Sequence, residues 1–220
     1  MTLNLQQLFK QNREQFNEDF RLRIHRSLSW LQRAEQAKQD EDIDSQFIFL
    51  WISFNAAYAK DLGAGIRSAD KGLFVQFIYR ICYLDKEQKI YSAVWDTFSG
   101  SIRVLLNNQF TFQPFWDYHN DLISEAEWKE GFERNKKKAL QALSQKDTTE
   151  ILAATFNHLY TLRNQIIHGG ATFNSTVNRS QLKDACNILS TLIPEMLLVM
   201  LNNHDDKTWG KPFYPVVNLD

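Results

Sequence analysis

The chain has 220 residues, of which 44% are hydrophobic, so it can bury a sizeable core as one domain or as a domain with an insertion. Its 25 Lys and Arg residues are balanced by 26 Asp and Glu residues, for a formal net charge of -1. This balance excludes the broad positive field of a polybasic nucleic-acid-binding protein, so any contact with RNA must be local.

Two cysteines, Cys82 and Cys186, are too few and too far apart for a zinc site or a disulfide framework. No pair of carboxylates and no group of histidines has the spacing of metal ligands, so we expect no metal and no other cofactor. We find no continuous apolar run of about 18 residues and no N-terminus of the signal type. We therefore expect a cytoplasmic protein without a membrane span.

Apolar residues recur at helical spacing over residues 3–38, and this pattern predicts one long helix that forms a wall of a bundle. Its apolar face consists of Leu5, Phe9, Phe16, Phe20, Ile24, Leu28 and Leu31. The opposite face is either a solvated surface or a strip that contacts phosphate, and it carries Arg13, Arg21, Arg23, Arg26 and Arg33.

A second helix is predicted over residues 43–60, where apolar side chains leave almost no polar face. We expect this helix to be central and surrounded on all sides. Asn55 is a polar exception, and a buried amide without a partner would cost about 1 to 3 kcal/mol. Asn55 should therefore either cross-link helices or orient Arg163 or His168, two side chains of a later helix that are described below.

Residues 62–114 are predicted to form a helical insertion of shorter pieces. Helical spacing is found over residues 72–83 and 86–98, and a turn is predicted at residues 99–101. The aromatic run at residues 110–116 should be irregular, and it serves either as a strap over the core or as a platform on which bases stack.

A capping-box sequence from Ser124 to Glu127 predicts the start of a helix that runs to about Gln145. The middle of this helix is the most basic segment of the chain, with Arg134, Lys136, Lys137 and Lys138. These cations either face solvent or contact RNA.

The best-delimited helix is predicted between Asp147 and Gly170. Asp147 or Thr148 can cap its start, and Gly169 with Gly170 can supply a left-handed stop. A broad apolar stripe between these signals predicts a helix that packs in a core.

A final helix is predicted over residues 179–203, followed by an extended tail at residues 207–220. Five long helical stripes with hardly any alternating pattern predict an all-α, up-and-down bundle of about five main helices, with the helical insertion described above. We expect residues 1–206 to form a single domain.

The helix that starts at Asp147 ends on Arg163 and His168. A helical step of about 100° places positions five apart about 140° apart in projection, so these side chains flank a groove. Histidine can exchange protons near neutral pH, while a guanidinium keeps its charge. Together they suit phosphate-ester chemistry, in which imidazole transfers protons and guanidinium stabilises the phosphorane charge.

The run Arg163-Asn164-x-x-x-His168, followed directly by two glycines, resembles the HEPN superfamily and is most similar to its Apea-like branch. The aromatic segment at residues 51–58, which contains Asn55, looks like the helix that precedes this motif in such proteins. The resemblance covers the helical frame, but not residues 62–114 or the tail. It implies a HEPN-like helical bundle and a homodimer in which the two motif-bearing helix ends face each other.

Our leading hypothesis is a metal-independent endoribonuclease in which the 2′-hydroxyl of RNA attacks the adjacent phosphate. His168 would act as base or acid, Arg163 would hold the scissile phosphate, and Asn164 and Asn55 would orient them. Because cleavage needs both an acid and a base and one chain supplies a single His168, a twofold pair of chains suits the reaction.

The alternative is a non-catalytic helical module. It would bind RNA or a nucleotide through Arg163 and His168, or bind a partner protein in a toxin-antitoxin or phage-defence pair. A third interpretation is purely structural: Arg163 caps neighbouring carbonyls and His168 merely ends its helix.

Overall fold

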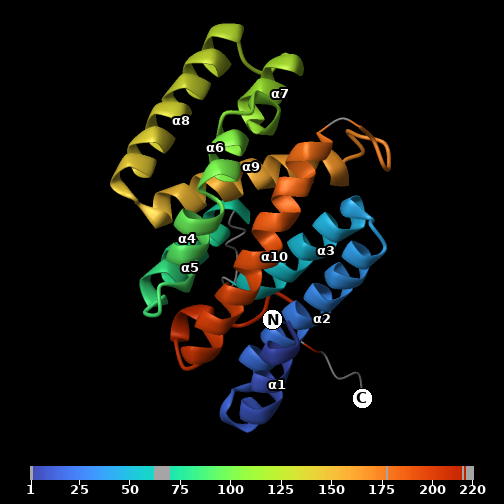
Figure 1. Ribbon diagram of the computed structural model, residues 1–220, viewed down its shortest axis with the longest axis vertical. Helices are drawn as coiled ribbons and strands as arrows, with labels where there is room; N and C mark the ends of the chain where they lie inside the picture. Colours follow the sequence, from blue (N-terminus) through green and yellow to red (C-terminus); the bar gives the residue numbers. More distant parts are fainter. Residues whose placement is uncertain (1, 62–69, 177, 215, 217–220) are drawn as a thin grey trace. The chain divides into compact units, whose positions relative to one another are not determined.

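The computed structural model describes residues 2–61, 70–176, 178–214 and 216 (Figure 1). These residues form ten α-helices and no β-strand, apart from one isolated bridge between Lys60 and Pro212. The predicted all-α helical bundle is therefore confirmed. The predicted start of the insertion, near residue 62, lies outside the described residues.

The chain divides into two compact units, one formed by Met1–Lys86 with Cys186–Asp220 and the other by Glu87–Ala185. Helix α10 (Arg179–Asn202) begins in the second unit and continues into the first. A division into compact units does not test whether either part folds alone. The predictions of a single domain and of an insertion therefore stay predictions.

Helix α10 is long and apolar enough to cross a membrane by length and composition alone. However, 67% of its most apolar window is buried inside the protein, as in the core helix of a globular protein. Pro194 lies inside this helix without ending it.

The predicted single helix over residues 3–38 is wrong, because two helices form a hairpin there. Helix α1 (Thr2–Asn12) and a 3-10 turn (Arg13–Gln15) precede helix α2 (Glu18–Gln39). The side chain of Asn17 caps α2 by accepting a hydrogen bond from the backbone N–H of Phe20, at 2.9 Å.

The α1–α2 hairpin brings the start of the chain back along α2. Gln6 Nε2 donates to Gln32 Oε1 at 3.1 Å. The rings of Phe9 and Phe16 stack with centroids 6.0 Å apart, one on each side of the break. The apolar spacing therefore continues through the break, which explains why periodicity alone did not detect it.

Helix α3 (Ile43–Tyr58) packs along α2 (Figure 1). Ser27 and Ser53 face each other, and each hydroxyl donates to the backbone carbonyl of the other residue at 2.8 Å. Phe47 and Phe54 are fully buried, whereas Phe49 and Ile52 are only partly buried. The expectation that α3 is surrounded on all sides is therefore wrong for one stripe of the helix.

Arg23 is buried within the first unit and does not belong to a surface strip of arginines. Its guanidinium donates to four backbone carbonyls, those of Ala57, Ala59, Trp209 and Gly210. Burial lowers the pKa of Arg23 to about 10, against the opposing effect of Asp19. Arg23 thus ties α2 to the end of α3 and to the C-terminal segment.

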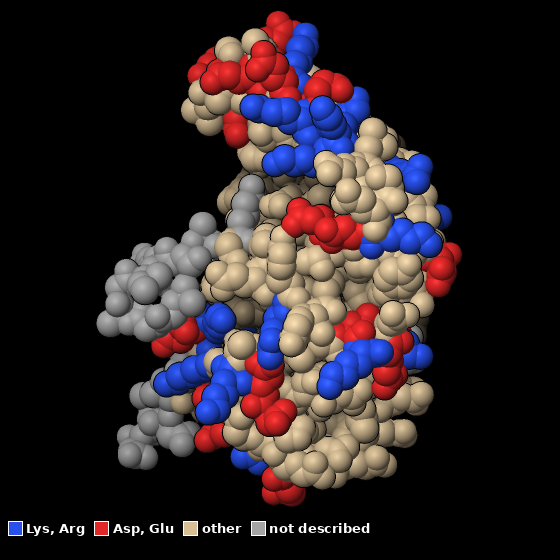
Figure 2. All heavy atoms as spheres, turned by 90° about the vertical axis from the view of Figure 1, so that its left-hand side faces the viewer, with Lys and Arg blue, Asp and Glu red and all other residues tan. Residues whose placement is uncertain are grey.

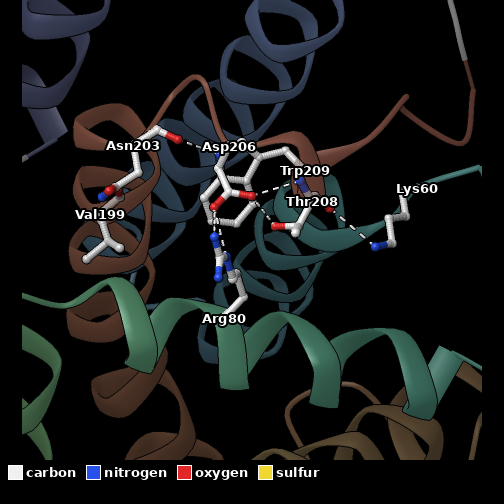
Figure 3. A network of polar contacts seen from close by, with 7 residues as sticks. All are labelled: Lys60, Arg80, Val199, Asn203, Asp206, Thr208 and Trp209. Carbon is white, nitrogen blue, oxygen red and sulfur yellow. Dashed lines mark hydrogen bonds and ion pairs between the residues drawn. The ribbon is translucent and has the colours of Figure 1, made fainter.

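A second polar network holds the C-terminal segment against helix α4 (Asp70–Leu84) (Figure 3). Asp206 accepts a hydrogen bond from Arg80 Nε at 2.8 Å and another from the backbone N–H of Thr208 at 2.8 Å. Burial would raise the pKa of Asp206, but hydrogen bonds from Thr208 and Arg80 outweigh this and lower it. The predicted tail therefore begins with an anchored 3-10 helix, Lys207–Trp209.

The second unit consists of short helices followed by two long ones. They are α5 (Lys89–Ser92), a π-helical turn (Ala93–Thr97), α6 (Ser99–Leu106), the 3-10 helix η3 (Gln109–Thr111), α7 (Gln113–His119), α8 (Glu125–Gln145) and α9 (Thr148–Ile167).

Local signals were interpreted correctly for the long helices of this unit and for residues 86–98, which contain α5 and the π-helical turn, but wrongly for residues 99–101 and 110–116. The predicted turn at residues 99–101 is the start of α6. The run at residues 110–116 is helical rather than irregular, because Pro114 occupies the first turn of α7, where its missing N–H is harmless. The capping box between Ser124 and Glu127 is confirmed, with both of its hydrogen bonds present.

Candidate functional site

The predicted site residues Arg163, Asn164 and His168 lie at the C-terminal end of α9. Asp147 caps the start of this helix by accepting a hydrogen bond from the backbone N–H of Glu150 at 3.0 Å. The predicted apolar stripe is buried at Ile151, Leu152, Phe156, Leu159 and Leu162, but its last two members are not: Ile166 is half-buried and Ile167 is exposed. The site residues therefore project from the end of a helix whose middle is held in a core.

His168 is the C-terminal cap of α9, and its side chain is exposed. Its backbone N–H donates to the carbonyl of Asn164 at 3.0 Å, which places it one helical turn beyond Asn164. The structure gives the imidazole no hydrogen bond to a described residue, so its two nitrogens are accessible to a ligand.

The two glycines after His168 turn the chain out of the helix. Gly169 has a positive φ of 72°, which confirms the predicted left-handed stop. The N–H of Gly170 donates to the carbonyl of Gln165 at 2.6 Å, and a Cβ at Gly170 would lie 2.9 Å from that oxygen. Glycine is therefore favoured at Gly169 by the positive φ, and at Gly170 by the lack of room for a Cβ atom.

Arg163 points its guanidinium toward its neighbour in the sequence. Nη1 donates to Oδ1 of Asn164 at 2.9 Å, and the guanidinium carbon lies 5.7 Å from the ring centroid of Tyr160. Nε is buried and has no hydrogen-bond partner among the described residues. Among the residues that the structure describes, no carboxylate pairs with Arg163, so the protein leaves its charge available to an anion.

Asn164 connects the two outer residues of the motif. On an ideal helix, Asn164 and His168 lie about 40° apart in projection, whereas Arg163 and His168 lie about 140° apart. Because Arg163 donates to Asn164, its guanidinium is drawn to the side of the helix from which His168 projects.

Gln165 is a residue of this helix end that the sequence analysis did not single out. Its Nε2 donates to the carbonyl of Phe110 at 2.6 Å, and its Oε1 accepts from Nδ2 of Asn178 at 3.0 Å. It therefore ties the end of α9 both to η3 and to the start of α10. Its partners are distant in the sequence, so no local pattern could have indicated them.

His158 is a second residue that the sequence analysis missed, and it is buried in the middle of α9. Asn135 Nδ2 lies 3.0 Å from Nε2, and Thr111 Oγ1 lies 2.8 Å from Nδ1. This network assigns the proton to Nδ1, because the amide of Asn135 donates to Nε2. Burial lowers the pKa of His158 to about 4, so the ring is neutral and cross-links α9, η3 and α8.

Asn55 lies on α3, in the other compact unit from Arg163 and His168. Its Oδ1 is buried and accepts no hydrogen bond within the described part of the chain. The expected hydrogen-bond partner for this oxygen is thus absent among the described residues. The predicted role of Asn55 in orienting Arg163 or His168 stays a prediction.

The predicted basic segment lies on α8, in the same unit as α9. Arg134, Lys137 and Lys138 are exposed at positions i, i+3 and i+4 and therefore share one face of the helix. Lys136 differs, because it pairs with Glu133 at 2.8 Å and lies 5.3 Å from the ring centroid of Phe132. Figure 2 shows Lys and Arg side chains gathered over α8, with acidic side chains above them.

A groove of about 870 Å³ lies in the first unit between α1, α2 and the C-terminal segment. Arg13, Arg21 and His25 line it, together with Lys211. Arg13 and Arg21 belong to the arginine face predicted over residues 3–38, whereas Arg163 and His168 are not part of the lining.

Within the described ranges, no group of three or more His, Cys, Asp or Glu side chains could hold a metal ion. The fold and the helix end thus define an all-α protein with an accessible Arg/His pair. Comparison with family models, with curated proteins and with solved structures finds no match for this chain. The resemblance to the HEPN superfamily therefore stays a prediction.

Proposed function

We propose that the protein is a metal-independent endoribonuclease that acts through Arg163 and His168 at the end of α9. The observation that carries this proposal is the state of the two side chains. Arg163 has no carboxylate partner among the described residues, and His168 is exposed on the side of the helix toward which Arg163 is drawn. A scissile phosphate can thus meet an imidazole and a guanidinium that no described carboxylate neutralises at one helix end.

The reaction follows from what these groups can do. An imidazole removes the proton from the 2′-hydroxyl, and O2′ then attacks the adjacent phosphorus. The guanidinium stabilises the charge that builds up on the phosphorane oxygens. The bond from phosphorus to O5′ breaks, an imidazolium returns a proton to O5′, and the products are a 2′,3′-cyclic phosphate and a 5′-hydroxyl.

A homodimer would supply the second histidine that this scheme uses, with one imidazole as base and the other, protonated, as acid. Asn164 would hold Arg163 in place through the bond between Nη1 and Oδ1. The exposed cations Arg134, Lys137 and Lys138 would contact the phosphates of the RNA outside the scissile position, and Lys136 would contribute less because Glu133 already neutralises it.

The test is a cleavage assay on RNA with analysis of the product ends. We expect cleavage that persists in EDTA, yields 2′,3′-cyclic phosphate ends and spares DNA, which lacks the nucleophile. Cleavage that disappears in EDTA and returns with magnesium, or equal cutting of a DNA oligomer, would contradict the mechanism.

His168→Ala should abolish this cleavage and leave the fold intact, because the side chain is exposed at a helix cap. His25→Ala is the matched control, since His25 is also exposed but lies on α2. If wild-type protein binds RNA but does not cleave it, the non-catalytic module is favoured. If His168→Ala unfolds the protein, the purely structural interpretation is favoured.

A further inference from the structure

Phe110 is an exposed aromatic residue held rigidly against the end of α9. Its side chain is 42% exposed although it lies on η3, within the packed second unit. A single exposed aromatic residue is ordinary on a protein surface. Phe110 differs because its backbone is bonded to the end of α9 that carries His168.

The backbone of Phe110 is fixed by three hydrogen bonds. Its N–H donates to Asn108 Oδ1 at 2.9 Å. Its carbonyl accepts from Trp116 Nε1 at 2.8 Å and from Gln165 Nε2 at 2.6 Å. Both lone pairs of this carbonyl are therefore used, and the residue has little freedom to move away from α9.

The ring of Phe110 stands on a cluster of other aromatic side chains. It meets Phe115 edge to face, with centroids 5.3 Å apart and an interplanar angle of 83°. Phe115 is buried and packs in the same manner on Trp128, at 5.2 Å and 90°. Because Phe115 and Trp116 pack against it, the ring is pre-positioned and needs little ordering when a ligand stacks on it.

Gln165 holds the backbone of Phe110 at the end of α9 that carries His168. Gln165 and His168 are three positions apart on α9 and are therefore neighbours on the helix surface. In projection His168 lies between Asn164, which holds Arg163, and Gln165, which holds Phe110. One ligand at this helix end can thus meet, in order, a guanidinium, an imidazole and an aromatic ring.

We propose that Phe110 stacks on an unpaired base of the substrate and so makes the site selective for single-stranded RNA. The identity of the substrate as RNA rests on the proposed function. An aromatic ring can stack on a base of a single strand, whereas a base inside a duplex already stacks on its neighbours. Arg163 would then hold a phosphate on one side of His168 while Phe110 holds a base on the other.

The proposal is tested by binding a labelled single-stranded RNA oligomer to the His168→Ala protein, which separates binding from cleavage. Phe110→Leu keeps an apolar side chain but removes the aromatic face, and it should weaken binding by roughly tenfold or more. Phe110→Trp should bind at least as tightly as the parent. Phe213→Leu is the matched control, because Phe213 is 52% exposed but lies in the other compact unit.

Two further ligands identify the contact. An oligomer with abasic positions should bind equally to the His168→Ala parent and to the parent that also carries Phe110→Leu, because it has no base to stack. The same strand in a duplex should bind more weakly than the single strand and should be indifferent to Phe110→Leu.

Each outcome separates this inference from the proposed function. If Phe110→Leu leaves both the affinity for single-stranded RNA and the circular dichroism unchanged, the inference is overturned. This holds even if wild-type protein cleaves RNA. Binding that depends on Phe110 without any wild-type cleavage supports the inference and contradicts the nuclease. Absence of RNA binding by every variant overturns both.

Discussion

Arg163 donates a hydrogen bond through Nη1 to Oδ1 of the adjacent Asn164, over 2.9 Å. The bond between these neighbours draws a permanently charged guanidinium to the side of α9 from which His168 projects. It gives Asn164 a definite place in the proposed site. Nε of Arg163 is buried and has no hydrogen-bond partner in the described part of the chain.

Asn164→Ala should lower the cleavage rate by about ten- to a hundredfold, because a misplaced charge-stabilising group forfeits much of its effect. The thermal midpoint should change little. Asn157→Ala is a suitable control, since Asn157 lies on the same helix and its side chain donates to the backbone carbonyl of Ala153, at 2.9 Å. Equal losses of cleavage in both variants would show that Asn164 acts through helix stability alone.

Arg163→Lys should lose most of the cleavage activity although it keeps the positive charge. An ammonium group cannot form the two parallel hydrogen bonds by which a guanidinium holds two phosphate oxygens. Single-turnover rates measured on the variant and on wild-type protein would reveal the difference. A lysine variant that cleaves at the wild-type rate would mean that charge alone suffices.

The protein should be a dimer in solution, with the α9 end of each chain at or beside the twofold interface. Multi-angle light scattering at micromolar concentration measures this directly. A mass of one chain under these conditions would argue strongly against a site composed of two histidines.

Gly170→Ala should destabilise the protein by about 1 to 3 kcal/mol, because the new Cβ would lie 2.9 Å from the carbonyl oxygen of Gln165. Gly131→Ala is the matched control within α8. Its Cβ would meet the ring of Phe112 at 3.7 Å, an ordinary contact, and a helical alanine should stabilise by about 0.5 to 1 kcal/mol. Urea unfolding of both variants should therefore give changes of opposite sign.

The free energy of unfolding should fall as the pH drops from about 6.5 to about 4, because of His158. Its pKa is about 4 in the folded chain against an ordinary value of 6.5, so only the unfolded chain binds the proton in this window. Each pH unit should remove about 1.4 kcal/mol, or about 3 kcal/mol across the window.

The measurement for His158 is urea unfolding at a series of pH values. His158→Gln should flatten the dependence on pH, since it removes the titrating group. An unchanged slope in His158→Gln would mean that other groups dominate the acid sensitivity of the fold.

Local sequence was enough to predict the helix caps and stops, because each of them depends on residues only a few positions apart. The cap at Asp147, the left-handed stop at Gly169 and the capping box from Ser124 to Glu127 were all predicted correctly. Each depends on a side chain or glycine that acts on backbone groups in the same helical turn, so its neighbours suffice to reveal it.

The break at Asn17 is an instructive exception among the local signals. Asn17 caps α2 through a bond to Phe20, three residues away, and could have been recognised. The apolar spacing instead suggested one helix, because Phe16, just before the cap, packs both on Phe9 of α1 and on Phe20 of α2. Apolar periodicity indicates which residues share a core. It does not indicate whether the helix between them is continuous.

Hydrogen bonds between polar side chains and residues far away in the sequence were visible only in the folded structure. The helical pattern places Arg23 among the surface arginines. In the structure Arg23 is buried, because it donates to the carbonyls of Ala57 and Trp209, 34 and 186 residues away. Gln165 meets Phe110 across 55 residues. Such bonds depend on how packed helices bring distant backbone groups together, and this is a property of the whole core rather than of any short stretch of sequence.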